Sequence, residues 1–417
     1  MTRSLIPTAL SGIVSAPPSK SIAHRALICA ALADGVSTVS PVDCSKDMDA
    51  TIGALTAMGA TIIRTGKTVT VTGIGKAANN AVIDCLESGS TVRFLIPVAA
   101  ALGIDASFIG HGRLPDRPLT PFYDILPCKG INLSGDKLPL NISGQLKSGE
   151  FSLRGDISSQ FITGLLFALP LLDGDSTIHL TTKLESAPYI DLTLDVLARF
   201  GIQINKTEQD YHIRGGQEYR PGNFTVEGDY SNAAFWLTAA ALGNQIDVAS
   251  LSPNSLQGDR RILDALSAFG AAFSLKDGVY HCTAPVCRPA VIDGRDIPDI
   301  LPILCVAATA VKGESIITGT KRLKMKESDR AAAMVDCLTR LGAKICEEDD
   351  RLIIRGETRL TGGRVNGYND HRIVMSMAVA SCLTDSPVII EGTKAVEKSY
   401  PGFFDDWHRL GGVSHVL

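Results

Sequence analysis

The sequence predicts an α/β protein made of six copies of one folding unit, divided equally between two domains. Three observations predict this architecture. A helix that ends on glycine recurs about every 70 residues, alternating strand pairs follow these glycines, and a second, almost wholly apolar helix lies between one glycine and the next. Such a period is too long for a solenoid repeat and fits a unit built around a four-stranded sheet.

The recurring helix ends at a glycine in each copy, and successive glycines are 69 to 72 residues apart. A residue in the left-handed conformation often ends a helix, and glycine adopts this conformation without steric cost. The glycines expected in this role are Gly59, Gly130, Gly201, Gly270, Gly342 and Gly411. Alternation of apolar and polar residues around a polar turn then predicts strand pairs after four of them. The pairs are expected at 60–73, 201–214, 271–283 and 343–355.

The second kind of helix is apolar nearly all round, which is typical of a helix inside a core. Each opens on a polar or proline-containing turn and is shorter than the roughly 18 residues that a bilayer span requires. The expected ranges are 21–32, 90–102, 158–172, 231–242, 297–311 and 371–383.

Six copies divide into three and three, which predicts one domain at 16–227 and a second at 1–15 with 228–417. The last copy stops after a single strand, and the N-terminal segment from Leu5 to Val14 is available to complete it. The chain would then cross between the domains near 15–20 and again near 226–230. Such a double hinge suits opening and closing around a ligand.

The composition argues against several classes of protein. A net charge of −4 disfavours general nucleic-acid binding. Neither a signal nor a transit peptide is evident, so a cytoplasmic protein without membrane association is expected. The ten cysteines form no CxxC pair, and the eight histidines show no HxxxH or HExxH spacing, so we expect reduced cysteines and no metal site. Walker, GxGxxG and GxSxG motifs are also missing, which disfavours kinases, dehydrogenases and serine hydrolases.

Polar residues gather in the loops just before the apolar helices. The three loops carry Lys20, Ser21 and Arg25, then Gly89 and Arg93, then Ser158, Ser159 and Gln160. Taken singly, a serine at a helix start is ordinary capping. If the copies are structurally equivalent, however, these helices run parallel, and their N-termini gather partial positive charge and free amides in one region. Anionic groups are the natural ligands of such a region.

Basic side chains elsewhere in the chain reinforce this expectation. They are Arg117, Lys324, Lys326, Arg330, Arg372 and Lys398. Two acids lie among them, Asp299 and Glu327, and a carboxylate set among cations is how general acid and base residues are poised. Two simpler readings stay open: Asp299 as an N-terminal helix charge, and the Lys326 stretch as a solvated helix start.

At this point the motifs resemble those of the 5-enolpyruvylshikimate-3-phosphate (EPSP) synthase family, the 3-phosphoshikimate 1-carboxyvinyltransferases. The resemblance spans nearly the whole chain. It is carried by the motifs at 17–21, 117–118, 158–160, 188–191, 226–229, 297–299, 326–330, 369–372 and 398–401. It implies the two-domain enolpyruvyl transferase fold of six βαβαββ units, with parallel buried helices inside and sheets outside. It also implies transfer of the enolpyruvyl group of phosphoenolpyruvate to the 5-hydroxyl of shikimate 3-phosphate, without metal or cofactor, by a monomer.

The resemblance also assigns roles to individual residues. Contacts to shikimate 3-phosphate are implied for Ser21, Arg25, Ser158, Ser159, Ser186, Tyr189, Asp299 and Lys326. Contacts to phosphoenolpyruvate are implied for Gly89, Arg117, Arg330, Arg372 and Lys398, with Gln160 between the substrates and Lys20 reaching both. Arg93, Asp370 and His371 would have supporting roles. Asp299 would accept the proton of the attacking hydroxyl, and Glu327 would deliver a proton to the methylene carbon and later remove one.

Two departures from the family pattern are local. Glu87-Ser88-Gly89-Ser90 stands where the family usually has Asn-Ala-Gly-Thr or Asn-Ser-Gly-Thr, which affects loop details and the response to glyphosate. Arg322 stands where a neutral polar contact is common and is left out of the site. Two alternative functions remain: a UDP-N-acetylglucosamine enolpyruvyl transferase, and a non-catalytic phosphosugar-binding protein on the same scaffold. The first would carry a reactive cysteine at 111–117, where none is present.

Overall fold

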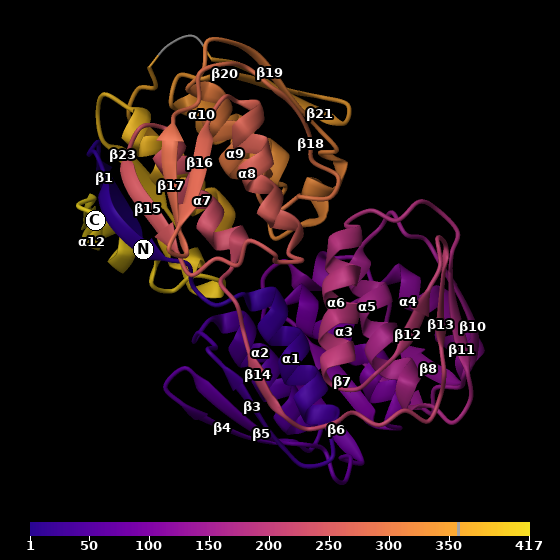
Figure 1. The fold of residues 1–417 in the computed structure, drawn as a ribbon. Helices are drawn as coiled ribbons and strands as arrows, with labels where there is room; N and C mark the ends of the chain where they lie inside the picture. Colours follow the sequence, from indigo (N-terminus) through magenta and orange to yellow (C-terminus); the bar gives the residue numbers. More distant parts are fainter. Residues whose placement is uncertain (357–358) are drawn as a thin grey trace. The chain divides into compact units, whose positions relative to one another are not determined.

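The computed structural model describes residues 1–356 and 359–417, which form two compact units. Unit 1 contains residues 1–17 and 227–417, and unit 2 contains residues 18–226, so the chain passes between the units after Pro17 and again after Val226. Figure 1 shows strands at the outside of each unit, around inner helices.

Each unit contains three four-stranded sheets within the described residues. The sheets of unit 2 have the strand orders β14-β3-β5-β4, β6-β7-β9-β8 and β10-β11-β13-β12. Their strands are β3 (Val36–Ser40), β4 (Thr61–Thr65), β5 (Thr68–Thr72), β6 (Asn80–Asp84), β7 (Asp105–Ile109), β8 (Ile131–Ser134), β9 (Leu140–Gly144), β10 (Gly149–Leu153), β11 (Ser176–Leu180), β12 (Ile204–Lys206), β13 (Asp210–Ile213) and β14 (Asn223–Thr225).

The sheets of unit 1 have the orders β16-β17-β15-β2, β18-β19-β21-β20 and β22-β23-β1-β24. Their strands are β1 (Thr2–Ile6), β2 (Ser11–Ser15), β15 (Gln245–Ala249), β16 (Ala272–Lys276), β17 (Val279–Ala284), β18 (Val291–Asp293), β19 (Gly313–Thr318), β20 (Lys344–Glu348), β21 (Arg351–Gly356), β22 (Gly363–Asn366), β23 (Val388–Glu391) and β24 (Val413–Val416). The four strand pairs predicted from alternation are all present as antiparallel pairs.

The helices alternate between two kinds along the chain. The inner helices are α1 (Lys20–Leu32), α3 (Gly89–Ala101), α5 (Ser159–Ala168), α7 (Tyr230–Ala241), α9 (Leu301–Thr309) and α11 (His371–Ala380). Their residues are almost all buried, and every residue of α7 is, as the apolar pattern predicts. The other helices are α2 (Lys46–Ala57), α4 (Thr120–Ile125), α6 (Ala187–Arg199), α8 (Ile262–Ala268), α10 (Arg330–Arg340) and α12 (Phe403–Arg409). They bury one face only, and the six predicted glycines that follow them have φ between 86° and 118°, in the left-handed region.

One predicted helix start is wrong. The apolar pattern predicts that the inner helix expected at 297–311 starts at Ile297, but this helix, α9, begins at Leu301. Residues 294–300 instead form successive turns, in which Ile297 N–H bonds to the Gly294 carbonyl and Ile300 N–H to the Ile297 carbonyl. Pro302 then lies in the first turn of α9, where its missing N–H costs no hydrogen bond.

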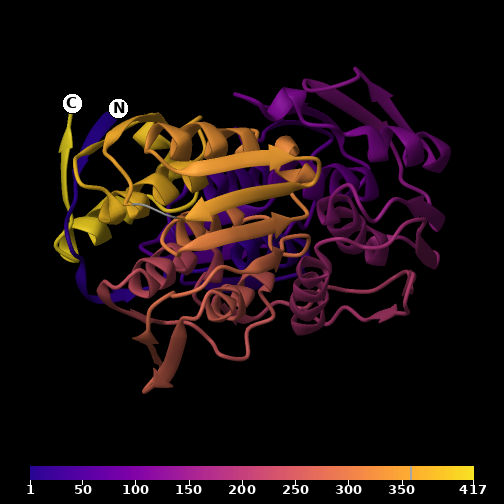
Figure 2. The ribbon, with the colours of Figure 1, turned by 90° about the horizontal axis from the view of Figure 1, so that it is seen from above.

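The N-terminal segment from Leu5 to Val14, which is expected to complete the last repeat, is divided between two strands. The chain breaks at Pro7 into β1, which pairs with β23 and β24, and β2, which pairs in parallel with β15 in a different sheet. Figure 2 shows indigo β1 beside yellow β24, so the last repeat is completed by residues 2–6. Proline has no N–H for a strand ladder, which explains the break.

Two strands are exchanged at the points where the chain changes unit. β2 directly precedes α1 in the sequence, yet it pairs with β15 of unit 1. β14 directly precedes α7, yet it pairs in parallel with β3 of unit 2. Every repeat therefore has the order βαβαββ, but one repeat in each unit takes its first strand from across a chain crossing. No helix in the part of the chain that the structure describes is long and apolar enough to cross a membrane.

Candidate active site

Several of the predicted site residues lie at or just before the N-terminal ends of the inner helices, while Ser186 and Tyr189 lie at the start of α6 and Lys326, Glu327 and Arg330 at the start of α10. Lys20 begins α1, Gly89 begins α3, Ser159 begins α5 and His371 begins α11. Ser158 caps α5 by accepting a hydrogen bond from the Gln160 amide at 3.3 Å, so the ordinary capping role is real for this serine. Helix N-termini carry partial positive charge and free amides, so this end of the helices suits anions.

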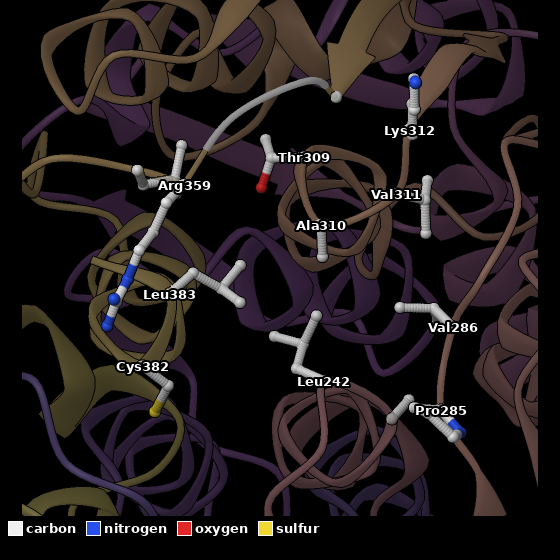
Figure 3. A pocket seen from close by; sticks show the side chains of 13 residues that line it. Leu242, Pro285, Val286, Thr309, Ala310, Val311, Lys312, Arg359, Cys382 and Leu383 are labelled. Carbon is white, nitrogen blue, oxygen red and sulfur yellow. The ribbon is translucent and has the colours of Figure 1, made fainter. Parts of the chain in front are cut away.

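The opposite end of the unit 1 helices contains a cavity of about 440 Å³. Leu242, Val286, Val311 and Leu383 line it where α7, α9 and α11 end (Figure 3). None of the predicted site residues is among its lining residues. Because the predicted site residues lie elsewhere, the N-terminal ends of the helices, which carry partial positive charge, remain the candidate site.

Eleven predicted residues lie in unit 2, and we call them the unit 2 cluster. They are Lys20, Ser21, Arg25, Gly89, Arg93, Arg117, Ser158, Ser159, Gln160, Ser186 and Tyr189. Lys20 Nζ pairs with Asp47 Oδ2 at 2.7 Å, and both side chains are mostly buried. Asp47 comes from the first turn of α2, so this ion pair joins the starts of α1 and α2.

The guanidinium of Arg25 is held by three donated hydrogen bonds inside unit 2. Nε donates to Thr193 Oγ1 at 2.8 Å, and the two terminal nitrogens donate to the carbonyls of Ser21 at 2.7 Å and Tyr189 at 3.0 Å. Burial lowers the pKa of Arg25 to about 10, so it stays cationic at neutral pH. Ser186, with φ of 58°, precedes α6 and is buried. Its carbonyl accepts a hydrogen bond from the amide of Tyr189, the residue whose own carbonyl accepts from Arg25.

Arg93 and Gln160 connect α3 with α5. Arg93 donates to Gln160 Oε1 at 2.8 Å and to the Pro118 carbonyl at 3.1 Å, while Gln160 Nε2 donates to Ser90 Oγ at 2.9 Å. The Pro118 contact also fixes the loop that carries Arg117. The structure therefore brings the glycine loop, the arginine loop and the start of α5 together, as the sequence predicts.

Gly89 leaves space that the guanidinium of Arg117 occupies. A Cβ atom built on Gly89 would lie 2.5 Å from Arg117 Nη1 and 2.7 Å from its Cζ. A side chain at this position would therefore displace Arg117.

If Arg117 binds phosphoenolpyruvate, as the family resemblance implies, Gly89→Ala should raise the KM for it by about 10- to 100-fold, the cost of one charge-assisted hydrogen bond. Steady-state kinetics with phosphoenolpyruvate varied would measure it. Gly53→Ala in α2 is the control, because a Cβ there meets no atom within 4 Å and should leave KM unchanged. An unchanged KM in Gly89→Ala would show that Arg117 does not bind phosphoenolpyruvate.

The remaining predicted residues lie in unit 1, and we call them the unit 1 cluster. They are Asp299, Lys326, Glu327, Arg330, Asp370, His371, Arg372 and Lys398. Arg330 is at its centre: Nη1 donates to Asp299 Oδ1 at 2.7 Å, and Nε donates to Asp370 Oδ2 at 2.8 Å. Lys326 Nζ lies 3.2 Å from the same Asp299 oxygen. The side chain of Arg330 is only 3% exposed, and its pair with Asp370 is fully buried, whereas Asp299 is partly exposed.

Glu327 lies between His371 and Lys398. Its Oε2 is 3.0 Å from His371 Nδ1 and 3.7 Å from Lys398 Nζ. Lys398 Nζ also donates to the Asn369 carbonyl at 2.5 Å. Asn369 and Tyr368 both have positive φ, so the backbone before Asp370 is held in a strained turn that presents this carbonyl.

Arg372 is anchored on α7. It donates to the Ser231 carbonyl at 2.7 Å, and its guanidinium lies 5.9 Å from the centre of the Phe235 ring. Ser231 Oγ donates to the buried carboxyl group of Asp259 in a short hydrogen bond. Burial, with the charge of Asp299 nearby, raises the pKa of Asp259 to about 6.

The cations of unit 1 keep its two candidate acids ionised. Burial alone would raise the pKa of Asp299, but Lys326, Arg372 and Arg330 hold it well below its usual value. Burial would likewise raise the pKa of Glu327, and His371, Lys398 and Arg330 hold it well below its usual value. Both groups are therefore carboxylates at neutral pH in the ligand-free protein.

Three atoms of Glu327, Asp370 and His371 lie within 4.8 Å of one another, which is the geometry of a possible metal site. Both carboxylates are already matched with protein cations, Asp370 with Arg330 and Glu327 with Lys398. An additional divalent cation would be repelled by these groups, so the cluster is better suited to anions.

Several residues of the site were missed by the sequence analysis. Asp47, Thr193 and Ser231 each hold a predicted residue in place, and Asp259 accepts a hydrogen bond from Ser231. Asp47 follows a helix-capping serine and reads as an ordinary first-turn acid, and Thr193 reads as part of an amphipathic helix. Only their contacts distinguish them, although Thr193 lies one turn after Tyr189, to whose carbonyl it also donates.

The fold is that of the enolpyruvyl transferases. The structure superposes on EPSP synthase from Acinetobacter baumannii with a TM-score of 0.83 at 26% identity, covering all of both chains. It also superposes on the enolpyruvyl transferase NikO from Streptomyces tendae with a TM-score of 0.79 at 16% identity, over 99% of this chain and 98% of the other, which shows the shared fold.

Sequence comparison specifies the family. The profile of EPSP synthase (3-phosphoshikimate 1-carboxyvinyltransferase) matches residues 5–407. The 3-phosphoshikimate 1-carboxyvinyltransferase of Clostridium beijerinckii is 46% identical over 98% of this chain and 97% of its own length. That of Clostridium kluyveri is 44% identical over the same shares of the two chains. The chain belongs to the EPSP synthase family, the transferases of the shikimate pathway that serve aromatic biosynthesis.

Proposed function

We propose that this chain transfers the enolpyruvyl group of phosphoenolpyruvate to the 5-hydroxyl of shikimate 3-phosphate, releasing inorganic phosphate. The main support is the charge of the two clusters: four cations in each, surrounded by helix N-termini. The two substrates together carry two phosphates and two carboxylates. Guanidinium groups pair with both kinds of anion in a bidentate manner, which suits this set of ligands.

The unit 2 cluster is proposed to bind most of shikimate 3-phosphate. Ser21, Arg25, Ser158, Ser159, Ser186 and Tyr189 are the proposed contacts, and Asp299 and Lys326 of unit 1 add to them. The fixed guanidinium of Arg25 and the free amides at the start of α5 support a phosphate or carboxylate position here. Lys20 is proposed to reach both substrates, which requires it to leave Asp47 or to be shared with it.

Phosphoenolpyruvate is proposed to bind Gly89, Arg117, Gln160, Arg330, Arg372 and Lys398. Arg93 supports this set through Gln160 and the Pro118 carbonyl, while Asp370 and His371 support it through Arg330 and Glu327. Both clusters belong to one chain, so we propose that a monomer suffices. The two chain crossings, after Pro17 and after Val226, are the proposed hinges through which both clusters act on one pair of substrates.

The chemistry proposed is addition followed by elimination through a tetrahedral ketal. Asp299 accepts the proton of the attacking hydroxyl, Glu327 gives a proton to the methylene carbon and later removes one, and Lys20 with the arginines stabilises the departing phosphate. In the ligand-free protein both acids are too weakly basic for this, because cations hold their pKa values down. When substrate anions pair with Lys326, Arg330 and Lys398, that effect weakens. Glu327 can then take up a proton and Asp299 becomes a stronger base.

The test is incubation of the protein with both substrates while phosphate release and the mass of the product are followed. We expect phosphate release that requires shikimate 3-phosphate and a product heavier by one enolpyruvyl group. Release with UDP-N-acetylglucosamine instead would support the related enolpyruvyl transferase reaction. Binding of shikimate 3-phosphate without turnover would support a non-catalytic protein, although the presence of both Asp299 and Glu327 disfavours it.

A further inference from the structure

Four buried, uncharged side chains form a continuous hydrogen-bonded chain across three helices of unit 2. His24 Nδ1 lies 2.7 Å from Thr51 Oγ1, Thr51 Oγ1 lies 2.8 Å from Thr91 Oγ1, and Thr91 Oγ1 donates to Ser88 Oγ at 2.8 Å. Each of these side chains is at most 1% exposed. None of the four has a role in the proposed chemistry, so their burial and connection need another explanation. We call them the His24 relay.

The direction of the relay follows from counting protons. Each hydroxyl has one proton to donate. Thr91 Oγ1 donates its proton to Ser88 Oγ, and this oxygen also accepts a hydrogen bond from the Thr91 amide at 3.2 Å. Thr51 must therefore donate to Thr91. With its proton used there, Thr51 can only accept from His24, so His24 carries its proton on Nδ1.

The surroundings of His24 agree with a neutral ring. Its Nε2 is buried and has no hydrogen-bond partner among residues 1–356 and 359–417. Burial without a partner costs less for a nitrogen lone pair than for an N–H group, so this nitrogen is expected to carry no proton. Burial, and the charges of Lys20 and Arg25, hold the pKa of His24 well below its usual value. The ring edge packs against Phe94 of α3, with centroids 6.5 Å apart.

The relay ends at the parts of unit 2 that bear the proposed ligand contacts. Ser88 caps α3 and precedes Gly89, against which Arg117 lies. His24 is one turn after Lys20 in α1, and Thr51 is one turn after Asp47 in α2, the residue that pairs with Lys20. The relay therefore joins the three helix starts that carry Lys20, Asp47 and Gly89.

We propose that the His24 relay is a set of positioning residues that fixes the Gly89 loop relative to Lys20 for the binding of phosphoenolpyruvate. This inference rests on the function proposed above. A neutral relay suits the task, because it aligns the loop without adding a charge that would compete with Lys20 and Arg25 for the substrate anions. Ser88 and Thr91 also satisfy the α3 N-terminus from within, which leaves the Gly89 amide available to a ligand.

Thr51→Val tests the relay, because it keeps the side-chain shape and removes the hydroxyl that makes two of the three hydrogen bonds of the relay. We expect the KM for phosphoenolpyruvate to rise about tenfold, the effect of leaving one buried polar group unpaired, with a smaller change in KM for shikimate 3-phosphate. Thr238→Val in α7 is the matched control. Its hydroxyl is also buried but has no hydrogen-bond partner in the described part of the chain, so both KM values should stay within about twofold.

Two substitutions of His24 separate positioning from simple packing. His24→Asn puts an amide N–H close to the Nδ1 position and should retain most of the affinity, whereas His24→Leu removes the donor and should match Thr51→Val. A lowered Tm with unchanged KM for phosphoenolpyruvate in Thr51→Val and His24→Leu would show a purely structural role and overturn the inference.

The protonation state can be examined without any activity measurement. In ¹⁵N-histidine NMR spectra we expect one ring to stay in the neutral Nδ1–H form through the pH range in which exposed histidines titrate, and to disappear in His24→Asn. A neutral Nε2–H form, or titration near neutral pH, would overturn the relay. If the spectra show the relay but the protein releases no phosphate, the proposed function is wrong, whereas the hydrogen-bonded chain itself is still supported.

Discussion

Replacement of Glu327 by glutamine should reduce kcat by about 10²- to 10⁴-fold, the usual contribution of a general acid or base. Glutamine keeps the size of the side chain, and its amide oxygen can still accept from His371 and Lys398, which lie 3.0 and 3.7 Å from Glu327 Oε2. It can neither give nor take the proton at the methylene carbon. We therefore expect the dissociation constants of both substrates to change little.

Pre-steady-state measurement of phosphate release, together with calorimetric binding of shikimate 3-phosphate, would separate these effects. Glu314→Gln is the control, since Glu314 is an exposed partner of Arg355 in unit 1 and should leave kcat unchanged. Near-normal turnover in Glu327→Gln would remove Glu327 from the chemistry. Lost turnover with equally lost binding would instead assign it to holding Lys398.

Local patterns in the sequence were sufficient to predict the repeats. The glycines at helix ends, the alternating strands and the wholly apolar helices each report on contacts close along the chain, and all three are observed. The exchange of β2 and β14 was not predictable in this way. Both are short strands whose partners, β15 and β3, lie more than 180 residues away, and pairing at that distance leaves no local signal.

The candidate site shows the same limit. Arg330, Glu327 and Arg372 stand out in the sequence because they are charged residues close to predicted helix starts, and the structure places all three near Asp299 or Lys398 in unit 1. Asp259 and Thr51 do not stand out, because an acid before a helix and a threonine within one are common. Their importance comes from burial next to a charged or polar partner on another helix, which no periodicity reports.

Replacement of Arg330 by methionine should strongly destabilise unit 1. The side chain is nearly fully buried and is the shared partner of Asp299 and Asp370, so its removal leaves the buried Asp370 and the partly exposed Asp299 short of a cation. Breaking a buried ion pair by removing one partner costs about 3–5 kcal/mol of folding free energy. Urea denaturation followed by tryptophan fluorescence would measure it, since Trp236 and Trp407 are both buried in the core of unit 1.

The matched control lies in the same helix. Arg340→Met removes an exposed pair with Asp336, and its effect on the denaturation midpoint should be small. If both variants unfolded at the wild-type urea concentration, the ion pairs of Arg330 would contribute nothing to stability. If both were equally destabilised, the cause would be the methionine in α10 and not the lost pairs.

The pH dependence gives an independent check, and its sign can be worked out. In the wild type the pKa of Asp299 is below its unfolded value, so its contribution to stability is complete above that unfolded value and is lost as the pH falls through the folded value. Arg330→Met removes one of the three cations that lower this pKa, while the burial that raises it stays. The pKa of Asp299 is then higher in the native variant than in the native wild type, so acid should destabilise the variant less than it destabilises the wild type. The difference in the free energy of unfolding between wild type and variant should therefore become smaller in acid. A difference that does not depend on pH would mean that Lys326 and Arg372 alone keep Asp299 ionised.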